Sequence, residues 1–192
     1  VCSSDLCTVV AGAVYITSGS IIGNSITNGG SSSAEAVTVN NSSSFQGDTV
    51  FIIGNKIKGT VTSTTSLYCN TTASVLSIKN NYIIHQYMGI YLYTCANSAL
   101  TNYIYNNTVY GEIYTFTNYG IYLGSVPASA IVEVMNNVVD ANNSGTKIGI
   151  YVSTLNGQAN AYYNHVDNSF NTTVGGGFTF AGNNTTNTAV NF

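Results

Sequence analysis

Charged side chains are scarce in this chain of 192 residues, which carries seven acidic residues, four lysines and no arginine. The net charge of -3 leaves no basic surface that could follow a phosphate backbone, so we expect no binding to nucleic acid. The sequence has no apolar run of about 18 residues, and we therefore expect no membrane span. Its length is sufficient for one domain with a buried core.

Helical patterns and proline are also nearly absent. No segment sustains an apolar period of about 3.6 residues, and the chain contains one proline, Pro127. Short β-branched segments alternate instead with stretches of Ser, Thr, Asn and Gly, which indicates strands and turns. A surface built from Asn, Ser and Thr is typical of extracellular repeat proteins, so we expect an extracellular or bacterial cell-surface location.

The chain does contain a repeat. A six-residue cassette, apolar-x-x-Asn-x-apolar, recurs six times with its asparagines 26 to 31 residues apart. These asparagines are Asn24, Asn55, Asn81, Asn107, Asn137 and Asn164. A second cassette, Gly-Ile-Tyr-Leu or a close variant, alternates with the first, at residues 89–92, 120–123 and 149–152, with weaker copies at 66–69 and 177–180. A repeat of this length indicates one supersecondary unit stacked on itself.

Stacking explains how such small units bury their apolar side chains. Each strand would pair in parallel with its copy about 4.8 Å away, and equivalent apolar positions would form columns inside the coil. The repeated asparagine would lie at a bend and bond to the asparagines above and below, forming a ladder. The alternative is an antiparallel β-sandwich, whose strands recur every ~8–12 residues without a position-matched asparagine.

The cassettes N-N-x-[IV] and G-I-Y-L resemble the repeats of right-handed parallel β-helix proteins of the pectate-lyase-like superfamily, over residues 14–180. The resemblance implies an all-β fold, a right-handed single-stranded parallel β-helix, or solenoid, of about six to seven coils. It does not imply one activity, because lyases, hydrolases, phage spikes, adhesins and structural surface proteins share this fold.

The first six residues, VCSSDL, resemble the translation of a common short-read sequencing adapter. A chance hexapeptide and the tail of a signal peptide are the alternatives. We therefore expect residues 1–6 to be an artefact, and residues 7–192 to be a β-helix domain from a metagenomic fragment of a longer protein.

Four tyrosines share the third position of the second cassette: Tyr68, Tyr91, Tyr122 and Tyr151. If the flanking Ile and Leu point inward, strand alternation places the tyrosines in a row on one outer face. Sugar rings stack on aromatic rings, and nearby amides and hydroxyls can bond to sugar hydroxyls, so the row predicts a polysaccharide-binding surface. The alternative is that tyrosine, a good strand residue, stacks on its own copies.

Two aspartates also match across coils, since Asp140 and Asp167 each follow the last apolar residue of a first cassette. His165 precedes Asp167 by two residues and shares its face. Neighbouring carboxylates repel, which raises one pKa or recruits a cation. Asp140 and Asp167 are thus candidate Ca²⁺ ligands, with no other cofactor expected, and Asp140, His165 and Asp167 are candidate catalytic residues for glycosidic cleavage. The alternative is two solvated aspartates that do not interact.

Two cysteines, Cys69 and Cys95, each lie nine residues before the first apolar residue of the next first cassette. This spacing predicts the same position on successive coils, within the Cα separation of about 4.4–6.8 Å that a disulfide requires. A disulfide and a pair of stacked, buried thiols are both consistent with it. His85 is expected alone in a surface loop.

The resemblance carries specific demands for catalysis. It implies an arginine base and several Ca²⁺-binding aspartates for pectate lyases, and Asn-Thr-Asp, Asp-Asp, Gly-His-Gly and Arg-x-Lys strings for polygalacturonases. The chain has no arginine and none of these strings. We therefore predict a non-catalytic extracellular stalk or adhesin-like surface domain that binds polysaccharide. The alternatives are a polysaccharide lyase or glycoside hydrolase acting near Asp140 and Asp167, and self-association through the strand edges of the coil ends.

Overall fold

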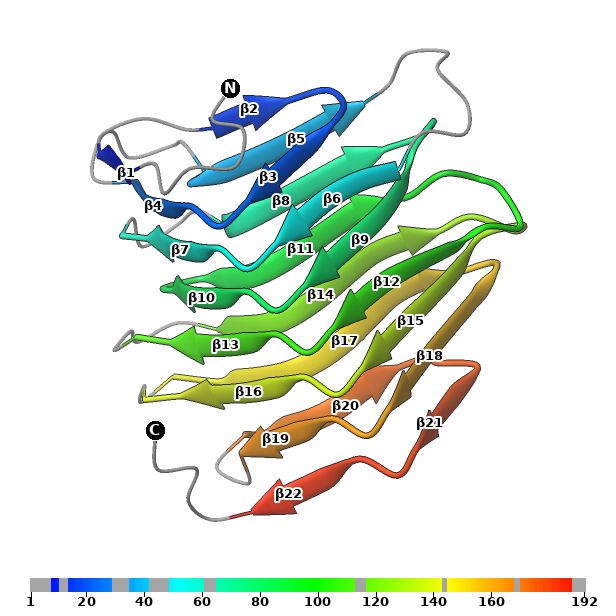
Figure 1. Ribbon diagram of the computed structural model, residues 1–192. Coiled ribbons are helices and arrows are strands. Elements are labelled where there is room, and N and C mark those ends of the chain that lie inside the picture. The colour runs from blue at the N-terminus through cyan, green and yellow to red at the C-terminus, as the bar shows by residue number, and fades with distance from the viewer. Residues whose placement is uncertain are drawn as a thin grey trace.

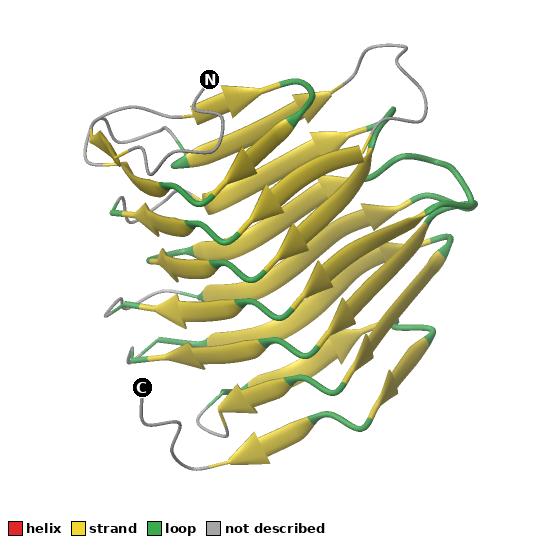
Figure 2. Ribbon diagram, in the orientation of Figure 1, coloured by secondary structure: helices red, strands yellow, loops and turns green. Residues whose placement is uncertain are grey.

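The computed structural model describes residues 8–10, 14–28, 35–41, 49–60, 65–112, 117–142, 145–167 and 170–187. These residues form twenty-two β-strands and no helix (Figure 2). None of them therefore belongs to a helix long and apolar enough to cross a membrane. Residues 1–6, the predicted artefact, lie outside the described residues.

The strands form three parallel sheets, in which each strand pairs with its counterparts in the coils before and after it, and the strand at each end of a sheet pairs on one side (Figure 1). Sheet A contains β1 (Thr8–Val10), β4 (Ser25–Asn28), β7 (Lys56–Gly59), β10 (Tyr82–His85), β13 (Thr108–Gly111), β16 (Val138–Ala141), β19 (His165–Asp167) and β22 (Thr185–Asn187). Sheet B contains β2 (Val14–Ile16), β5 (Val37–Asn41), β8 (Thr65–Thr71), β11 (Met88–Thr94), β14 (Asn118–Val126), β17 (Lys147–Leu155) and β20 (Thr172–Gly176). Sheet C contains β3 (Ser20–Ile22), β6 (Thr49–Ile53), β9 (Val75–Lys79), β12 (Thr101–Tyr105), β15 (Ile131–Met135), β18 (Gln158–Tyr162) and β21 (Phe180–Gly182).

Because every third strand falls in the same sheet, the chain winds as a β-solenoid, which confirms the predicted all-β parallel coil. The antiparallel sandwich is wrong, since every strand pair that the structure describes is parallel. About five turns, from β5 to β19, have a hydrogen-bonded neighbour on both sides in all three sheets. This count is slightly lower than the six to seven coils expected from the repeat.

The core is the interior of the coil, where the apolar positions of the first cassette form two columns. Ile52, Ile78 and Ile104 are register partners in sheet C and are fully buried. The sheet A column is Ile26, Ile57, Ile83, Val109, Val139 and Val166. Fully burying one such side chain contributes roughly 1.5–3 kcal/mol, so the repeated apolar positions stabilise the stack of coils.

The predicted asparagine ladder is present at the corner between sheets C and A. The Nδ2 atom of each ladder asparagine donates to the Oδ1 atom of the next, over 2.9–3.3 Å. The same Oδ1 atoms accept the backbone N–H of the preceding ladder residue, as in Asn107 N to Asn137 Oδ1 at 3.0 Å. A seventh member, Asn184, extends the ladder beyond the six predicted. The sequence pattern missed it because Thr186 stands where the cassette has its second apolar residue.

The residue before each ladder asparagine has a left-handed backbone. These residues are Gly23, Gly54, Asn80, Asn106, Asn136, Tyr163 and Asn183, with φ between 53° and 69°. Glycine and asparagine tolerate this conformation better than other residues, which explains the Asn-Asn pairs in the repeat. Tyr163, at φ 55°, is the exception.

Candidate functional site

The four predicted tyrosines lie in one row on the outer face of sheet B. Tyr68, Tyr91, Tyr122 and Tyr151 are successive register partners on β8, β11, β14 and β17. Ile90 and Leu92, on either side of Tyr91, are fully buried, whereas Tyr91 is partly exposed. The strand alternation that predicted an outward row therefore holds at this position.

The rings of this row pack on one another. Successive centroids lie 5.5, 5.1 and 5.7 Å apart from Tyr68 to Tyr151. The first two contacts are edge-to-face, and the last is a stack with an interplanar angle of 15°. These are the separations that aromatic pairs favour, so each ring supports its neighbour.

Three more tyrosines that sequence reasoning missed extend this cluster. Tyr93 contacts Tyr91, with centroids 5.9 Å apart, and Tyr119 lies 4.9 Å from Tyr122, with Tyr87 beside Tyr119. Alternation from Tyr91 could have found Tyr93. Tyr119 could not be found in this way, because it is an odd number of residues from Tyr122, and Tyr87 could not, because it lies just before β11 begins. We call the surface formed by Tyr68, Tyr87, Tyr91, Tyr93, Tyr119, Tyr122 and Tyr151 the tyrosine face.

A glycine makes room for one of these rings. A β-carbon at Gly124 would lie 3.1 Å from a ring carbon of Tyr91 and 2.8 Å from the carbonyl oxygen of Tyr93. The ring of Tyr91 therefore covers the backbone of the neighbouring strand, where a side chain would displace it.

Burial raises the pKa of three phenols of this face. It raises the pKa of Tyr91 to about 12, with smaller contributions from Tyr122 and Tyr68. Burial also raises the pKa of Tyr68 and of Tyr119. The tyrosine face thus combines aromatic surface with phenol hydroxyl groups, which can both donate and accept hydrogen bonds.

The acidic candidates lie near the end of sheet A. Val139 and Val166 are register partners, so Asp140 and Asp167, the residues that follow them, stand on neighbouring strands. Burial raises the pKa of Asp140, the N–H of Ala141 opposes this at 2.7 Å, and repulsion from Asp167 raises it further. His165 lies beside Thr185, with Nδ1 and Oγ1 3.0 Å apart.

No metal site is evident in the described part of the chain, where no three His, Cys, Asp or Glu side chains are arranged around one ion position. Catalysis and Ca²⁺ binding at Asp140 and Asp167 stay predictions. Lys147 lies close to this set, with its Nζ 3.5 Å from the carbonyl oxygen of Ala141, and its charge lowers the pKa of Asp140.

The predicted register of the cysteines is wrong. Cys69 on β8 is the register partner of Leu92 on β11, and Cys95 follows the end of β11, so the two cysteines do not occupy the same position on successive coils. Both thiols are free and buried. The turn after β11 spans residues 95–100 but the turn after β8 spans 72–74, so equal distances to the next cassette do not mean equal positions. Burial raises the pKa of both thiols, that of Cys95 to about 12.

His85, expected at the surface, is fully buried at the end of β10.

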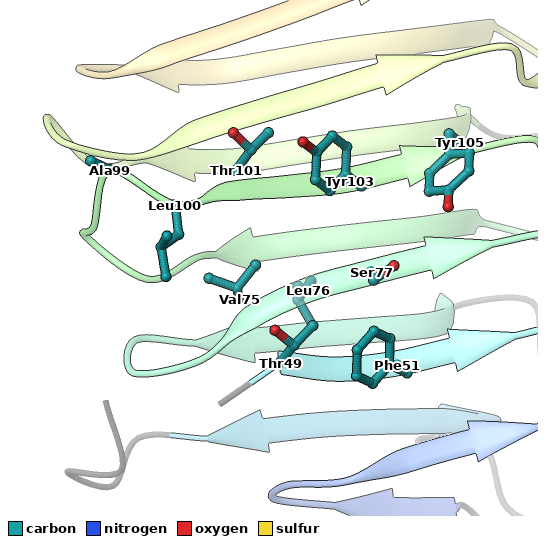
Figure 3. Close-up of a pocket in the computed structure, with 10 residues that line it drawn as sticks. All are labelled: Thr49, Phe51, Val75, Leu76, Ser77, Ala99, Leu100, Thr101, Tyr103 and Tyr105. Atoms are coloured by element: carbon teal, nitrogen blue, oxygen red, sulfur yellow. The ribbon is translucent and has the colours of Figure 1, made fainter. Parts of the chain in front are cut away.

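Sequence reasoning did not predict a hollow that lies on the outer face of sheet C. Its volume is about 560 Å³. Figure 3 shows Ser77, one of the residues that line it, on the strand between those that carry Phe51 and Tyr103. These three residues are register partners, and Phe51 and Tyr103 are 40% and 38% exposed. The small side chain of Ser77 leaves the space between the two rings unfilled. Side chains alternate between the two faces along β6 and β12, and this alternation was the signal that could have placed Phe51 and Tyr103 on the outer face.

Comparison with family models, with curated proteins and with solved structures found no match to this chain. The resemblance to pectate-lyase-like repeats therefore rests on the cassettes, and the structure supports its coarser part, a parallel β-solenoid.

Proposed function

We propose that this chain is a non-catalytic extracellular stalk or adhesin-like domain that binds a polysaccharide along the tyrosine face. The observation that carries the proposal is the in-register row of Tyr68, Tyr91, Tyr122 and Tyr151. A row that repeats once per coil offers equivalent contacts to a ligand that is itself a repeating chain.

The chemistry of the face favours a carbohydrate. Uncharged sugars combine apolar C–H faces with hydroxyl groups, and the tyrosine face combines ring surface with phenol hydroxyl groups. Tyr93, which is 49% exposed, offers the most accessible ring among the seven. The scarcity of charge in the chain argues further against an ionic ligand on this face.

The test is retention of the chain on immobilised neutral and acidic polysaccharides, with affinity electrophoresis to compare variants. Tyr122→Ala should weaken binding at least about tenfold, because Tyr122 contacts three neighbouring rings on this face. Tyr122→Phe, which keeps the ring, should retain most of the affinity. Tyr82→Ala is the matched control, since Tyr82 is an exposed tyrosine on sheet A.

Equal affinity of Tyr122→Ala and the unaltered chain would reject the tyrosine face as the binding site. Melting of each variant, followed by circular dichroism, separates loss of binding from loss of fold. Retention without production of shorter chains would support a non-catalytic role.

A second candidate, a glycan-cleaving enzyme, is favoured by the raised pKa of Asp140, because a carboxyl group that holds its proton more tightly can serve as a general acid. If the chain cleaves polysaccharides, Asp140→Asn should abolish the release of reducing ends, and Glu112→Gln should not change it. Activity that survives Asp140→Asn would exclude this site.

A further inference from the structure

A smaller hollow, about 330 Å³, lies on the outer face of sheet C towards the C-terminal end of the coil. Three aromatic side chains, Tyr162, Tyr163 and Phe180, and the carboxylate of Glu133 line it. The centroid of Tyr162 lies 5.4 Å from that of Tyr163 and 6.1 Å from that of Phe180, at interplanar angles of 79° and 60°. The three rings therefore form the sides of the hollow.

The outer rings of this hollow are open to solvent. Tyr163 is 59% exposed and Phe180 is 50% exposed. A β-carbon at Gly182 would lie 2.5 Å from the ring of Phe180, so the absence of a side chain there leaves room for the ring beside Tyr162, the register partner of Gly182. The ring faces are therefore available to a ligand.

The carboxylate of Glu133 is held by neutral groups. Its Oε1 accepts a hydrogen bond of 2.9 Å from Nδ2 of Asn160, the register partner of Glu133 on β18. A hydrogen bond to Glu133, together with burial, raises the pKa of Tyr162 to about 12, so its phenol stays neutral. Among the described residues, Lys58 forms an ion pair with Glu112 beside sheet A. No such ion pair is found at Glu133 in this part of the chain.

Aromatic faces attract cations through their quadrupole, and a fixed carboxylate adds a longer-range attraction. A bare metal ion would require several oxygen ligands, whereas here one carboxylate stands among rings. We propose that this hollow, the cation pocket, binds an organic ammonium group, either a quaternary ammonium or a protonated alkylamine. This inference does not depend on the proposed polysaccharide binding, which concerns sheet B.

Choline and its neutral isostere 3,3-dimethylbutan-1-ol provide the test, because the two differ in charge and hardly in shape. Titration of the full chain by calorimetry, or by NMR of its aromatic protons, should show saturable choline binding. The alcohol should bind at least about tenfold more weakly, because it lacks the charge that the rings and the carboxylate attract. Phe180→Ala should weaken choline binding severalfold with little effect on melting, since half of that ring is exposed.

The charge is tested by Glu133→Gln, which should weaken choline binding by about tenfold while keeping an acceptor for Asn160. Glu112→Gln is the matched control, because it removes a carboxylate from sheet A, away from the pocket. Three outcomes would each overturn the proposal: no saturable choline binding, equal binding of the neutral alcohol, or equal weakening by Glu133→Gln and Glu112→Gln.

Discussion

Buried polar side chains at two corners of the solenoid differ in how their polar atoms are satisfied. At the corner between sheets C and A, each ladder asparagine donates to a copy of itself one coil away. At the corner between sheets A and B, neither ring nitrogen of the buried His85 has a protein partner, nor does Oδ1 of Asn118. A buried amide thus stabilises a coil only where the next coil supplies the complementary group at the same height.

The difference follows from loop length. Two residues connect sheet C to sheet A in every coil, as at Asn106 and Asn107. From sheet A to sheet B the connection has two residues after β10 but five after β16. Constant turns place the same atoms above one another, whereas variable turns place different atoms together.

The largest expected effect comes from removing one rung of the ladder. Asn107→Leu leaves the carbonyl oxygen of Ile78 and the N–H of Asn81 without their partner in the ladder. It also removes one of the two donors to Oδ1 of Asn137, which keeps the backbone N–H of residue 107. At about 1–3 kcal/mol for each of the two unpaired groups, we expect a loss of at least about 2 kcal/mol in the free energy of unfolding. Urea denaturation measures this loss. Asn97→Leu, at an exposed asparagine, is the control, and a loss below about 1 kcal/mol for Asn107→Leu would contradict the ladder's role.

The second effect concerns His85. Burial lowers its pKa from 6.5 to about 3, and the nearby backbone of Tyr87 opposes this only in part. The unfolded chain therefore binds a proton below pH 6.5 that the folded chain does not, so His85 costs stability as pH falls from 6.5 towards 3. At about 1.4 kcal/mol per pH unit, the loss at pH 5 should be about 2 kcal/mol.

Urea denaturation at pH 8 and pH 5 measures this loss as the difference between the unaltered chain and His85→Asn. The substitution should reduce the drop in stability between the two pH values by most of that amount. An identical drop in both proteins would show that His85 does not cause it.

A third, smaller effect tests the constant turn. Tyr163 holds a left-handed conformation that asparagine or glycine occupies in the other six turns. Tyr163→Asn should raise the free energy of unfolding by about 0.5–1 kcal/mol, because asparagine adopts this conformation with less strain. Thermal melting checks the sign. A lower melting temperature would mean that the contact between the rings of Tyr163 and Tyr162 outweighs the strain.

The last effect, which depends on a bound ion, concerns the acidic residues beside the variable corner. If Asp140 and Asp167 hold Ca²⁺, a concentration of about ten times the dissociation constant adds about 1.4 kcal/mol of stability. The melting temperature should then rise by roughly 3–5 °C. Asp167→Asn should remove the rise. A rise that persists in this variant would place the Ca²⁺ elsewhere.

The same contrast explains what the sequence could predict. The ladder, the apolar columns and the sheets follow from one spacing that the constant turn preserves, so the predicted positions inside the cassettes of Asn81 and Asn107 were correct. Cys69 and Cys95 were misplaced because a turn of variable length lies between them and the residues from which they were counted.

The outer faces were predictable in part. The tyrosine row kept its register because Tyr91, Tyr122 and Tyr151 share one strand position with their neighbours. The two hollows on sheet C could not be predicted from repetition. They arise where the repeat is broken, at Ser77 between two rings and at Gly182 beneath Phe180.

The ladder also gives the molecule a direction. Within the ladder, each side-chain amide donates to the asparagine on its C-terminal side and accepts from the one on its N-terminal side, so the amide-to-amide bonds all run in one direction along the axis of the coil. At the first rung, the Oδ1 atom of Asn24 is buried with no donor among the described residues. Another asparagine rung stacked before Asn24 would complete the series, whereas an inverted coil would present the wrong end of its amide. The row of amides therefore encodes a polarity, which any assembly that continues this stack has to match.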